Sequence, residues 1–131
     1  MAENKNVVDL VNDFLLYLTV EKHYAKNTVN SYERDLYQLE HYLEDYESEA
    51  VLDNIDEIDY ALMRRYLAYL NSLHLAKSTI SRKLSACRSF YRYLMKKQIV
   101  EASPPSEVIT PKKEKRLPKF LYYDEMKAVL E

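Results

Sequence analysis

Residues Leu75–Lys97 read LAKSTISRKLSACRSFYRYLMKK, and this stretch decides the fold that the sequence predicts. Apolar residues recur in it every three or four positions, which is the spacing of one buried helix face. They are Ile80, Leu84, Cys87, Tyr91 and Leu94. At about 100° per residue, basic residues fall on the other side of the same helix. They are Arg82, Arg88, Arg92 and Lys96. The stretch therefore predicts one amphipathic helix with a basic outer face.

The opening of this helix has an echo earlier in the chain. Ala76–Ser81 reads AKSTIS, and Ala25–Asn30, 51 residues before it, reads AKNTVN. Each copy opens a helical pattern with a lysine and several hydroxyl or amide groups. Helix N-termini with such side chains bind phosphates well. The pair predicts two elements that face one long polyanion, and duplex DNA is our interpretation.

Helical periodicity also predicts helices over Val7–Lys22, Lys26–Tyr46 and about Asp59–Leu73. Asn6 is the expected N-cap of the first of these, and Asp56 or Asp59 can cap the third. Ser48–Asp56 reads as a polar connection in which Val51, Leu52 and Ile55 are the expected core anchors. The chain contains no glycine, and tight strand hairpins usually need it. We therefore expect an all-α fold.

The net charge of −2 hides a strong segregation of charge. Glu33–Asp59 carries eleven acidic residues and one basic residue, whereas Tyr60–Val100 carries nine basic residues and no acidic one. A solvated face normally mixes both signs. An acid-free run of 41 residues therefore favours an anionic partner.

The sequence offers no catalytic centre. The three histidines are scattered, and without glycine there is no phosphate-cradling loop. We expect no metal, no cofactor and no catalytic residue. The single Cys87 reads as a core residue, and so do four seam tyrosines. These are Tyr32, Tyr46, Tyr66 and Tyr91. The chain shows no apolar run long enough for a membrane span and no signal peptide, which predicts a cytoplasmic protein.

The composition changes after Val100. Residues 1–103 are predicted to form a helical domain of ordinary size, with the Pro-Pro pair at 104–105 stopping its last helix. Residues 104–119 read as a basic linker interrupted by prolines, and 120–131 read as the start of a second domain.

Four blocks carry a family resemblance. They are VNDFLLYLTVEKHYAKNTVNSYERDL (11–36), STISRKLSACRSFYRYLMKK (78–97), TPKKEKRLPKFL (110–121) and YYDEMKAVLE (122–131). In order and spacing they resemble the N-terminal core-binding domain of tyrosine recombinases of the phage integrase family. The nearest type is Xer, in the XerC/CodV branch of low-GC Gram-positive bacteria. The sequence departs from the family's usual residues at Ala25, Cys87 and Ser103. These are a cap position, a core position and the end of a helix.

The resemblance implies a four- to five-helix SAM-like domain made of two helix hairpins crossed at a steep angle. It implies that the second and fourth helices cross the major groove of double-stranded DNA at a recombination half-site. It also implies that a catalytic domain follows the linker and forms a 3′-phosphotyrosyl link. The chain ends before the first catalytic arginine of that domain would appear. By this reading the chain cannot cut or rejoin DNA, whereas its full-length parent is a recombinase.

The residues and the resemblance together define a set of expected DNA contacts. Groove contacts are expected from Lys26, Asn27, Thr28, Asn30, Lys77, Ser78, Thr79, Arg82 and Lys83. Phosphate contacts are expected from Arg88, Arg92, Lys112, Lys113, Lys115 and Arg116. Lys83 is the weakest member, since it lies on the flank of the apolar side.

The expected role is resolution of chromosome dimers at cell division. It would be carried out by a recombinase tetramer that includes a paralogous recombinase, while this chain alone would be monomeric and free of membranes. One alternative is the integrase of a phage or conjugative transposon. An arm-binding domain before residue 1 would favour it, and the early start of the first helix at Val7 argues against one. A second alternative is a helical protein-interaction module whose acidic half docks a basic partner without nucleic acid.

Overall fold

The computed structural model describes residues 4–108, and every regular element within that range is helical. The elements are α1 (Val7–Val20), α2 (Lys26–Tyr46), α3 (Glu49–Asp53), the 3₁₀ turn η1 (Ile55–Glu57), α4 (Tyr60–Ser72), α5 (Lys77–Lys96) and α6 (Pro104–Glu107). The all-α prediction is confirmed. The four long helices match their predicted ranges to within about two residues at each end, as helix ends commonly do.

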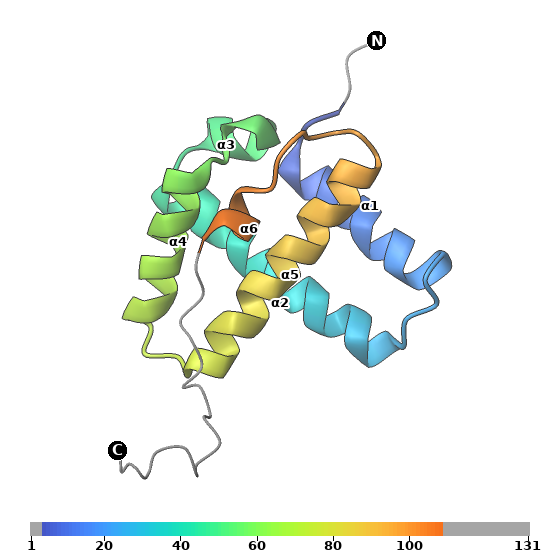
Figure 1. The fold of residues 1–131 in the computed structure, drawn as a ribbon, viewed down its shortest axis with the longest axis horizontal. Coiled ribbons are helices and arrows are strands. Elements are labelled where there is room, and N and C mark those ends of the chain that lie inside the picture. Colours follow the sequence, from blue (N-terminus) through green and yellow to red (C-terminus); the bar gives the residue numbers. More distant parts are fainter. Residues whose placement is uncertain (1–3, 109–131) are drawn as a thin grey trace, which may run out of the picture.

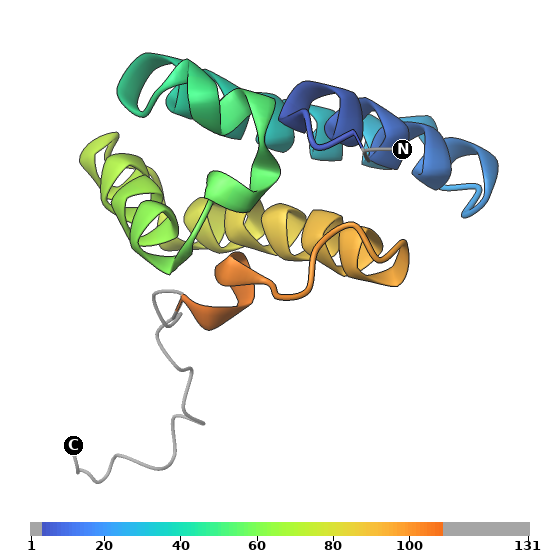
Figure 2. The same ribbon diagram turned by 90° about the horizontal axis from the view of Figure 1, so that it is seen from above.

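The long helices form two hairpins in two layers. α1 and α2 make one layer with α3, and α4 and α5 make the other, with α6 on its outer side (Figure 2). Seen through the layers, α5 crosses α2 at a steep angle (Figure 1). The predicted architecture of two crossed helix hairpins is thereby confirmed.

The core fills the space between the layers. Phe14 of α1 and Phe90 of α5 meet there with their ring centroids 5.6 Å apart. The leucines of the α2 seam at positions 36, 39 and 43 are fully buried. Cys87 and two of the seam tyrosines, Tyr66 and Tyr91, are buried as predicted. Tyr32 is half-buried. The prediction for Tyr46 was wrong, because this last residue of α2 is 63% exposed, although its ring lies 5.2 Å from that of Tyr69 of α4.

Two predicted caps are present. The Asn6 side chain accepts a hydrogen bond from the Asp9 amide, and the Asp59 side chain accepts one from the Leu62 amide. α2 and α5 lack such caps, because alanine stands at both N-cap positions, Ala25 and Ala76. The absence of a capping side chain distinguishes these two helix starts from those of α1 and α4.

The turns that lead into α2 and α5 share one backbone conformation. His23 and His74 each lie three residues before the first helical lysine and have positive φ angles of 54° and 58°. The alanines that follow have φ, ψ angles of −62°, 150° and −63°, 150°. The sequence echo noticed from the alanines onward therefore begins two residues earlier, at the histidines.

Three short elements depart from the expectations. The stretch predicted as a polar connection contains two short helical elements, α3 and η1, whereas its expected anchors Val51 and Ile55 are buried as predicted and Leu52 is partly buried. The prediction that the Pro-Pro pair stops the last long helix was wrong, because α5 already ends at Lys96; the pair instead opens α6, since proline is well suited to a first helical turn. Pro105 and Val108 are buried. The packed body thus reaches Val108, past the boundary expected at residue 103.

Candidate nucleic-acid interface

The starts of α2 and α5 lie along one edge of the molecule, the lower edge of Figure 1. We call the first turns Lys26–Asn30 and Lys77–Ser81 at this edge the N-terminal edge. The two helices diverge from their crossing toward this edge, so the two starts stand apart from each other. This spacing suits a partner that is long compared with a single helix end.

The backbone at both starts offers free amide groups. The amides of Thr28 and Val29 bond to the Ala25 carbonyl, at 3.0 and 3.1 Å, and Thr79 and Ile80 repeat this with Ala76. No described group accepts from the amides of the residues before them, at positions 26, 27, 77 and 78. Unpaired first-turn amides and the positive end of the helix dipole attract anions.

Most of the predicted groove residues are accessible at this edge. The exposed ones are Lys26, Asn27, Thr28, Asn30, Lys77 and Ser78, and Thr79 is half-buried. The groove contacts expected at the start of α2 and those expected at the start of α5 thus lie along one accessible edge. DNA contact itself stays a prediction for each of them.

Arg82 and Lys83 share one buried carboxylate. Arg82 donates two hydrogen bonds to Asp35, at 2.7 and 3.0 Å, and the Lys83 ammonium donates a third at 3.0 Å. Asp35 is 2% exposed and Lys83 is 8% exposed. The expectation that Lys83 reaches DNA does not fit this burial, and we remove Lys83 from the proposed contacts. Arg82 keeps an exposed side chain but is committed to the ion pair.

Two opposing influences act on the Asp35 carboxyl. Burial by itself raises its pKa, whereas the hydrogen bonds from Arg82 and Lys83 lower it. The bonds prevail, so the pKa of Asp35 lies below its ordinary value and the group is a carboxylate at neutral pH. Its two cationic partners neutralise it, so that it does not repel an approaching phosphate.

A groove lies where α2 and α5 cross, beside the N-terminal edge. It has a volume of about 260 Å³ and is lined by Thr28, Ser31, Tyr32, Asp35, Arg82, Ser85 and Ala86. Small hydroxyl side chains in such a groove permit a close backbone approach and can donate to phosphate. The N-terminal edge and this groove together form the candidate interface.

The remaining residues predicted to contact phosphate differ in their exposure and hydrogen bonding. Arg92 is exposed, and its guanidinium donates a hydrogen bond to the Ser89 hydroxyl at 3.1 Å. Arg88 is half-buried and donates to the carbonyl oxygens of Pro105 and Val108, at 3.0 and 2.9 Å. Its guanidinium therefore fastens α6 to α5, and it is not a free phosphate ligand. Lys112, Lys113, Lys115 and Arg116 lie outside the described residues.

The far end of α2 is organised around an acid. Glu47 receives two hydrogen bonds from Arg65 of α4, at 2.9 and 3.0 Å, and one from the Tyr42 hydroxyl at 2.6 Å. These bonds, the Arg65 ones foremost, hold the pKa of Glu47 below its ordinary value. The acidic end of α2 thus anchors α4 and lies away from the N-terminal edge (Figure 1).

Glu40 gives a testable pH dependence. One of its carboxylate oxygens is buried without a hydrogen-bond partner. Burial raises the pKa of Glu40 to about 7 from 4.5, although nearby His41 opposes the shift. The folded protein therefore binds more protons than the unfolded chain between those two values, and stability contributed by Glu40 is lost as pH rises through them. We expect Glu40→Gln to raise the melting temperature at pH 8 and to flatten the decline between pH 5 and 8.

Thermal unfolding monitored by circular dichroism across that pH range measures this effect. Glu44→Gln, on an exposed site of the same helix, is the matched control. If both variants follow the wild-type profile, burial of Glu40 has no energetic consequence.

Residues 4–108 also show neither a metal site nor a membrane-spanning helix. No group of three or more His, Cys, Asp or Glu side chains there is placed to hold a metal ion. No helix in that range is long and apolar enough to cross a membrane.

Comparison with known families decides the relationship. The model of the phage integrase N-terminal SAM-like domain matches residues 11–98. This chain belongs to that family. The matched range runs from within α1 to the end of α5, so it contains both helix hairpins and the whole candidate interface.

Curated relatives of this family member are longer proteins. The chain is 41% identical over 122 residues to a tyrosine recombinase XerC from Pelotomaculum thermopropionicum, covering 92% of this chain and 40% of that protein. A tyrosine recombinase XerC from Halalkalibacterium halodurans is 39% identical over 121 residues, covering 92% and 39%. One from Staphylococcus haemolyticus is 39% identical over 118 residues, covering 90% and 38%. The chain thus spans about two fifths of these relatives. No solved structure matched it.

Proposed function

We propose that this chain is the DNA-binding part of a site-specific tyrosine recombinase and that it grips a double-stranded recombination half-site. The observation that carries the proposal is the repeated, uncapped helix start at the N-terminal edge. Each copy presents a lysine, a threonine and two free amides in the same backbone conformation. Such ends bind phosphate oxygens, and their side chains can reach base edges in a groove.

The proposed contacts are those that the structure leaves accessible. At the edge they are Lys26, Asn27, Thr28, Asn30, Lys77, Ser78 and Thr79, with Arg82 at the groove and Arg92 beyond it. Lys112, Lys113, Lys115 and Arg116 stay in the proposal as phosphate contacts from the basic segment that follows. Arg88 and Lys83 act inside the fold.

The finer role follows the relatives. Their printed name, tyrosine recombinase XerC, supports a parent enzyme that resolves chromosome dimers rather than one that integrates a mobile element. In that role the parent would cut and rejoin DNA through a phosphotyrosyl intermediate in a tetramer with a paralogous recombinase. Recombination assays with the full-length parent on chromosomal and on attachment-site DNA distinguish the two roles.

A salt titration tests DNA binding. The full chain should bind a labelled half-site duplex with an affinity that falls steeply with salt, because each neutralised phosphate adds about −0.9 to the log-log slope. Lys26→Ala with Lys77→Ala should weaken binding at least tenfold at low salt and reduce the slope by about 2. Fluorescence anisotropy at four salt concentrations provides the measurement.

Arg64→Ala is the control, because it removes one exposed charge from α4, a helix that carries none of the proposed contacts. It should bind within about twofold of the wild type. Absence of duplex binding at low salt would instead support a helical protein-interaction module. Equal losses in the control and in the double variant would point to net charge alone.

A further inference from the structure

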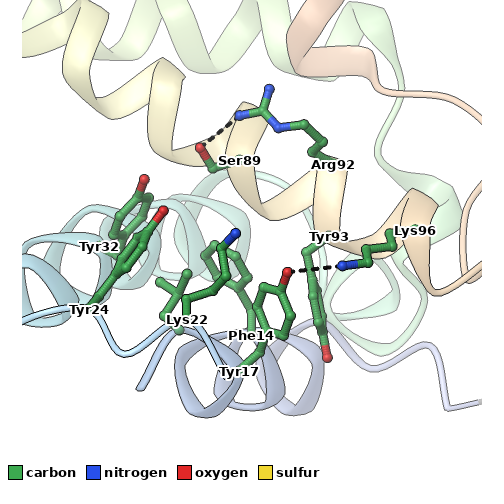
Figure 3. Close-up of a pocket in the computed structure, with 10 residues that line it drawn as sticks. Phe14, Tyr17, Lys22, Tyr24, Tyr32, Ser89, Arg92, Tyr93 and Lys96 are labelled. Atoms are coloured by element: carbon green, nitrogen blue, oxygen red, sulfur yellow. Dashed lines mark hydrogen bonds between the residues drawn. The ribbon is translucent and has the colours of Figure 1, made fainter. Parts of the chain in front are cut away.

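A second pocket lies on the side of α1 and α5, next to the turn that leads into α2. Figure 3 shows its lining, which comes from α1, that turn, α2 and the second half of α5. The pocket has a volume of about 240 Å³. Its lining residues are Phe14, Tyr17, Leu18, Lys22, Tyr24, Tyr32, Ser89, Arg92, Tyr93 and Lys96. The volume is several times that of one water molecule, about 30 Å³.

Three cations line this pocket, and no carboxylate does. They are Lys22, Arg92 and Lys96. None of the three forms an ion pair with a described residue, whereas Arg65, Arg82 and Lys83 all do. Like charges gathered without counter-charge repel one another, and an anion relieves that repulsion. The charge of the pocket therefore points to an anionic ligand.

The pocket also supplies neutral donors around an aromatic floor. The Lys96 ammonium lies 3.3 Å from the Tyr17 hydroxyl and 5.5 Å from the centre of its ring. In Figure 3 the hydroxyls of Tyr24 and Tyr32 point the same way as the Lys22 ammonium. Neither hydroxyl has a hydrogen-bond partner among the side chains drawn there. Hydroxyl and ammonium donors over apolar rings suit the oxygens of a phosphate joined to a sugar.

Tyr32 connects this pocket to the candidate interface. Its side chain lines both the pocket and the groove at the crossing of α2 and α5. Tyr24 lies two residues before Lys26, the first residue of the N-terminal edge. A polyanion bound at the start of α2 would therefore extend to the pocket and its three cations.

We propose that this pocket binds a backbone phosphodiester of the same duplex, which adds Lys22, Lys96, Tyr24 and Tyr32 to the footprint. The inference rests on the proposed DNA-binding function and extends it toward α1. The phosphate sits among the three cations, with the tyrosine hydroxyls donating to its free oxygens.

The test compares two lysine substitutions in the full chain. Lys22→Ala with Lys96→Ala should weaken half-site binding about tenfold at low salt and reduce the log-log salt slope by about 1, the change for one lost phosphate contact. Lys97→Ala is the matched control, because Lys97 adjoins Lys96 in sequence but lines a different depression with Asp13 and Glu21. The control should bind within about twofold of the wild type. Unchanged melting temperatures establish that the variants remain folded.

A scan with single methylphosphonates locates the phosphate. Each duplex has one neutral linkage. The wild type should lose affinity at one particular linkage. This linkage should differ from those at which the effect of the methylphosphonate disappears in Lys26→Ala. At that linkage the Lys22→Ala, Lys96→Ala variant should show no further loss. Additive losses at every linkage would overturn the inference.

Two other outcomes separate the claims. If the wild type binds no duplex, both the proposed function and this inference fail. If the wild type binds but the double lysine variant matches Lys97→Ala, only the inference fails. Inorganic phosphate at constant ionic strength tests for a free anion. If it shifts the NMR signals of Tyr24 and Tyr32 while the double variant retains duplex affinity, the pocket takes free phosphate and the inference is overturned.

Discussion

Replacing Asp35 with alanine is expected to destabilise the domain by about 3–5 kcal/mol, the usual cost of breaking a buried ion pair from one side. The carboxylate is almost wholly buried and joins α2 to α5 through Arg82 and Lys83. Its removal leaves the buried Lys83 ammonium without an acceptor. Urea unfolding followed by circular dichroism measures the loss at constant m-value.

Two companion variants identify the cause. Arg82→Ala should cost much less, since the Arg82 side chain is 54% exposed and its loss leaves Asp35 paired with Lys83. Asp35→Leu with Lys83→Met removes both buried charges, and such exchanges are often neutral or stabilising. A double variant as unstable as Asp35→Ala would show that lost packing, and not the unpaired charge, explains the effect.

The same ion pair predicts an acid transition. Because the pKa of Asp35 is lowered in the folded state, its contribution to stability is present above the ordinary carboxyl pKa and is lost as pH falls through the folded value. Glu40 acts with the opposite sign over the range between 4.5 and about 7.

Replacing Phe90 with alanine is expected to cost about 3–5 kcal/mol, the range for large aromatic truncations in a core. Phe90 is fully buried on α5 and its ring meets those of Phe14 and Tyr91, at 5.6 and 5.8 Å between centroids. Its loss opens a cavity between the two layers, where the crossed hairpins cannot close without shifting the N-terminal edge. The domain should therefore lose DNA affinity as well as stability.

Leu16→Ala serves as the control, since Leu16 lies on the outer side of α1 and is 61% exposed. It should change the free energy of unfolding by less than about 0.5 kcal/mol. Equal losses for the two variants would contradict a core that lies between the layers. Denaturant unfolding and half-site binding of both variants supply the data.

The sequence predicted the long helices well because their apolar spacing is strong and their packing is ordinary. It missed α3, η1 and α6 because three- to five-residue helices carry no periodicity. Tyr46 continues the seam in sequence, but at the last residue of α2 its ring contacts Tyr69 of α4 and still stays 63% exposed. Spacing along one helix does not show how fully the opposite layer covers its last turn.

The ion pair at Asp35 was within reach of the same reasoning. Asp35 follows Tyr32 by three residues and precedes Leu39 by four, so it lies on the α2 seam. Lys83 holds the same relation to Ile80 and Cys87 on α5. Opposite charges on two facing apolar seams predict a buried pair. The segregation of charge along the chain hid this pair, because Asp35 is one of eleven acidic residues in its stretch and Lys83 is one of nine basic residues in the next.

The roles of Arg88 and of the Lys22–Lys96 pocket depended on the fold. Arg88 lies on the outer side of α5 by helical phase, but that side is covered by α6, which the sequence did not predict. Lys22 and Lys96 are 74 residues apart and meet only because α1 packs beside the end of α5.

The turns at His23 and His74 have matching backbone conformations, so the short segments that lead into α2 and α5 should be exchangeable. Six residues, HYAKNT at 23–28 and HLAKST at 74–79, follow one backbone path with three identical side chains apart from the histidines. Either hexapeptide should therefore be accepted in place of the other without a change in chain direction. Such a transplant would leave Tyr24 against Leu75 and Asn27 against Ser78 as the sole differences. The two exchanges would thus compare, within one protein, how each helix start contributes to the proposed DNA contact.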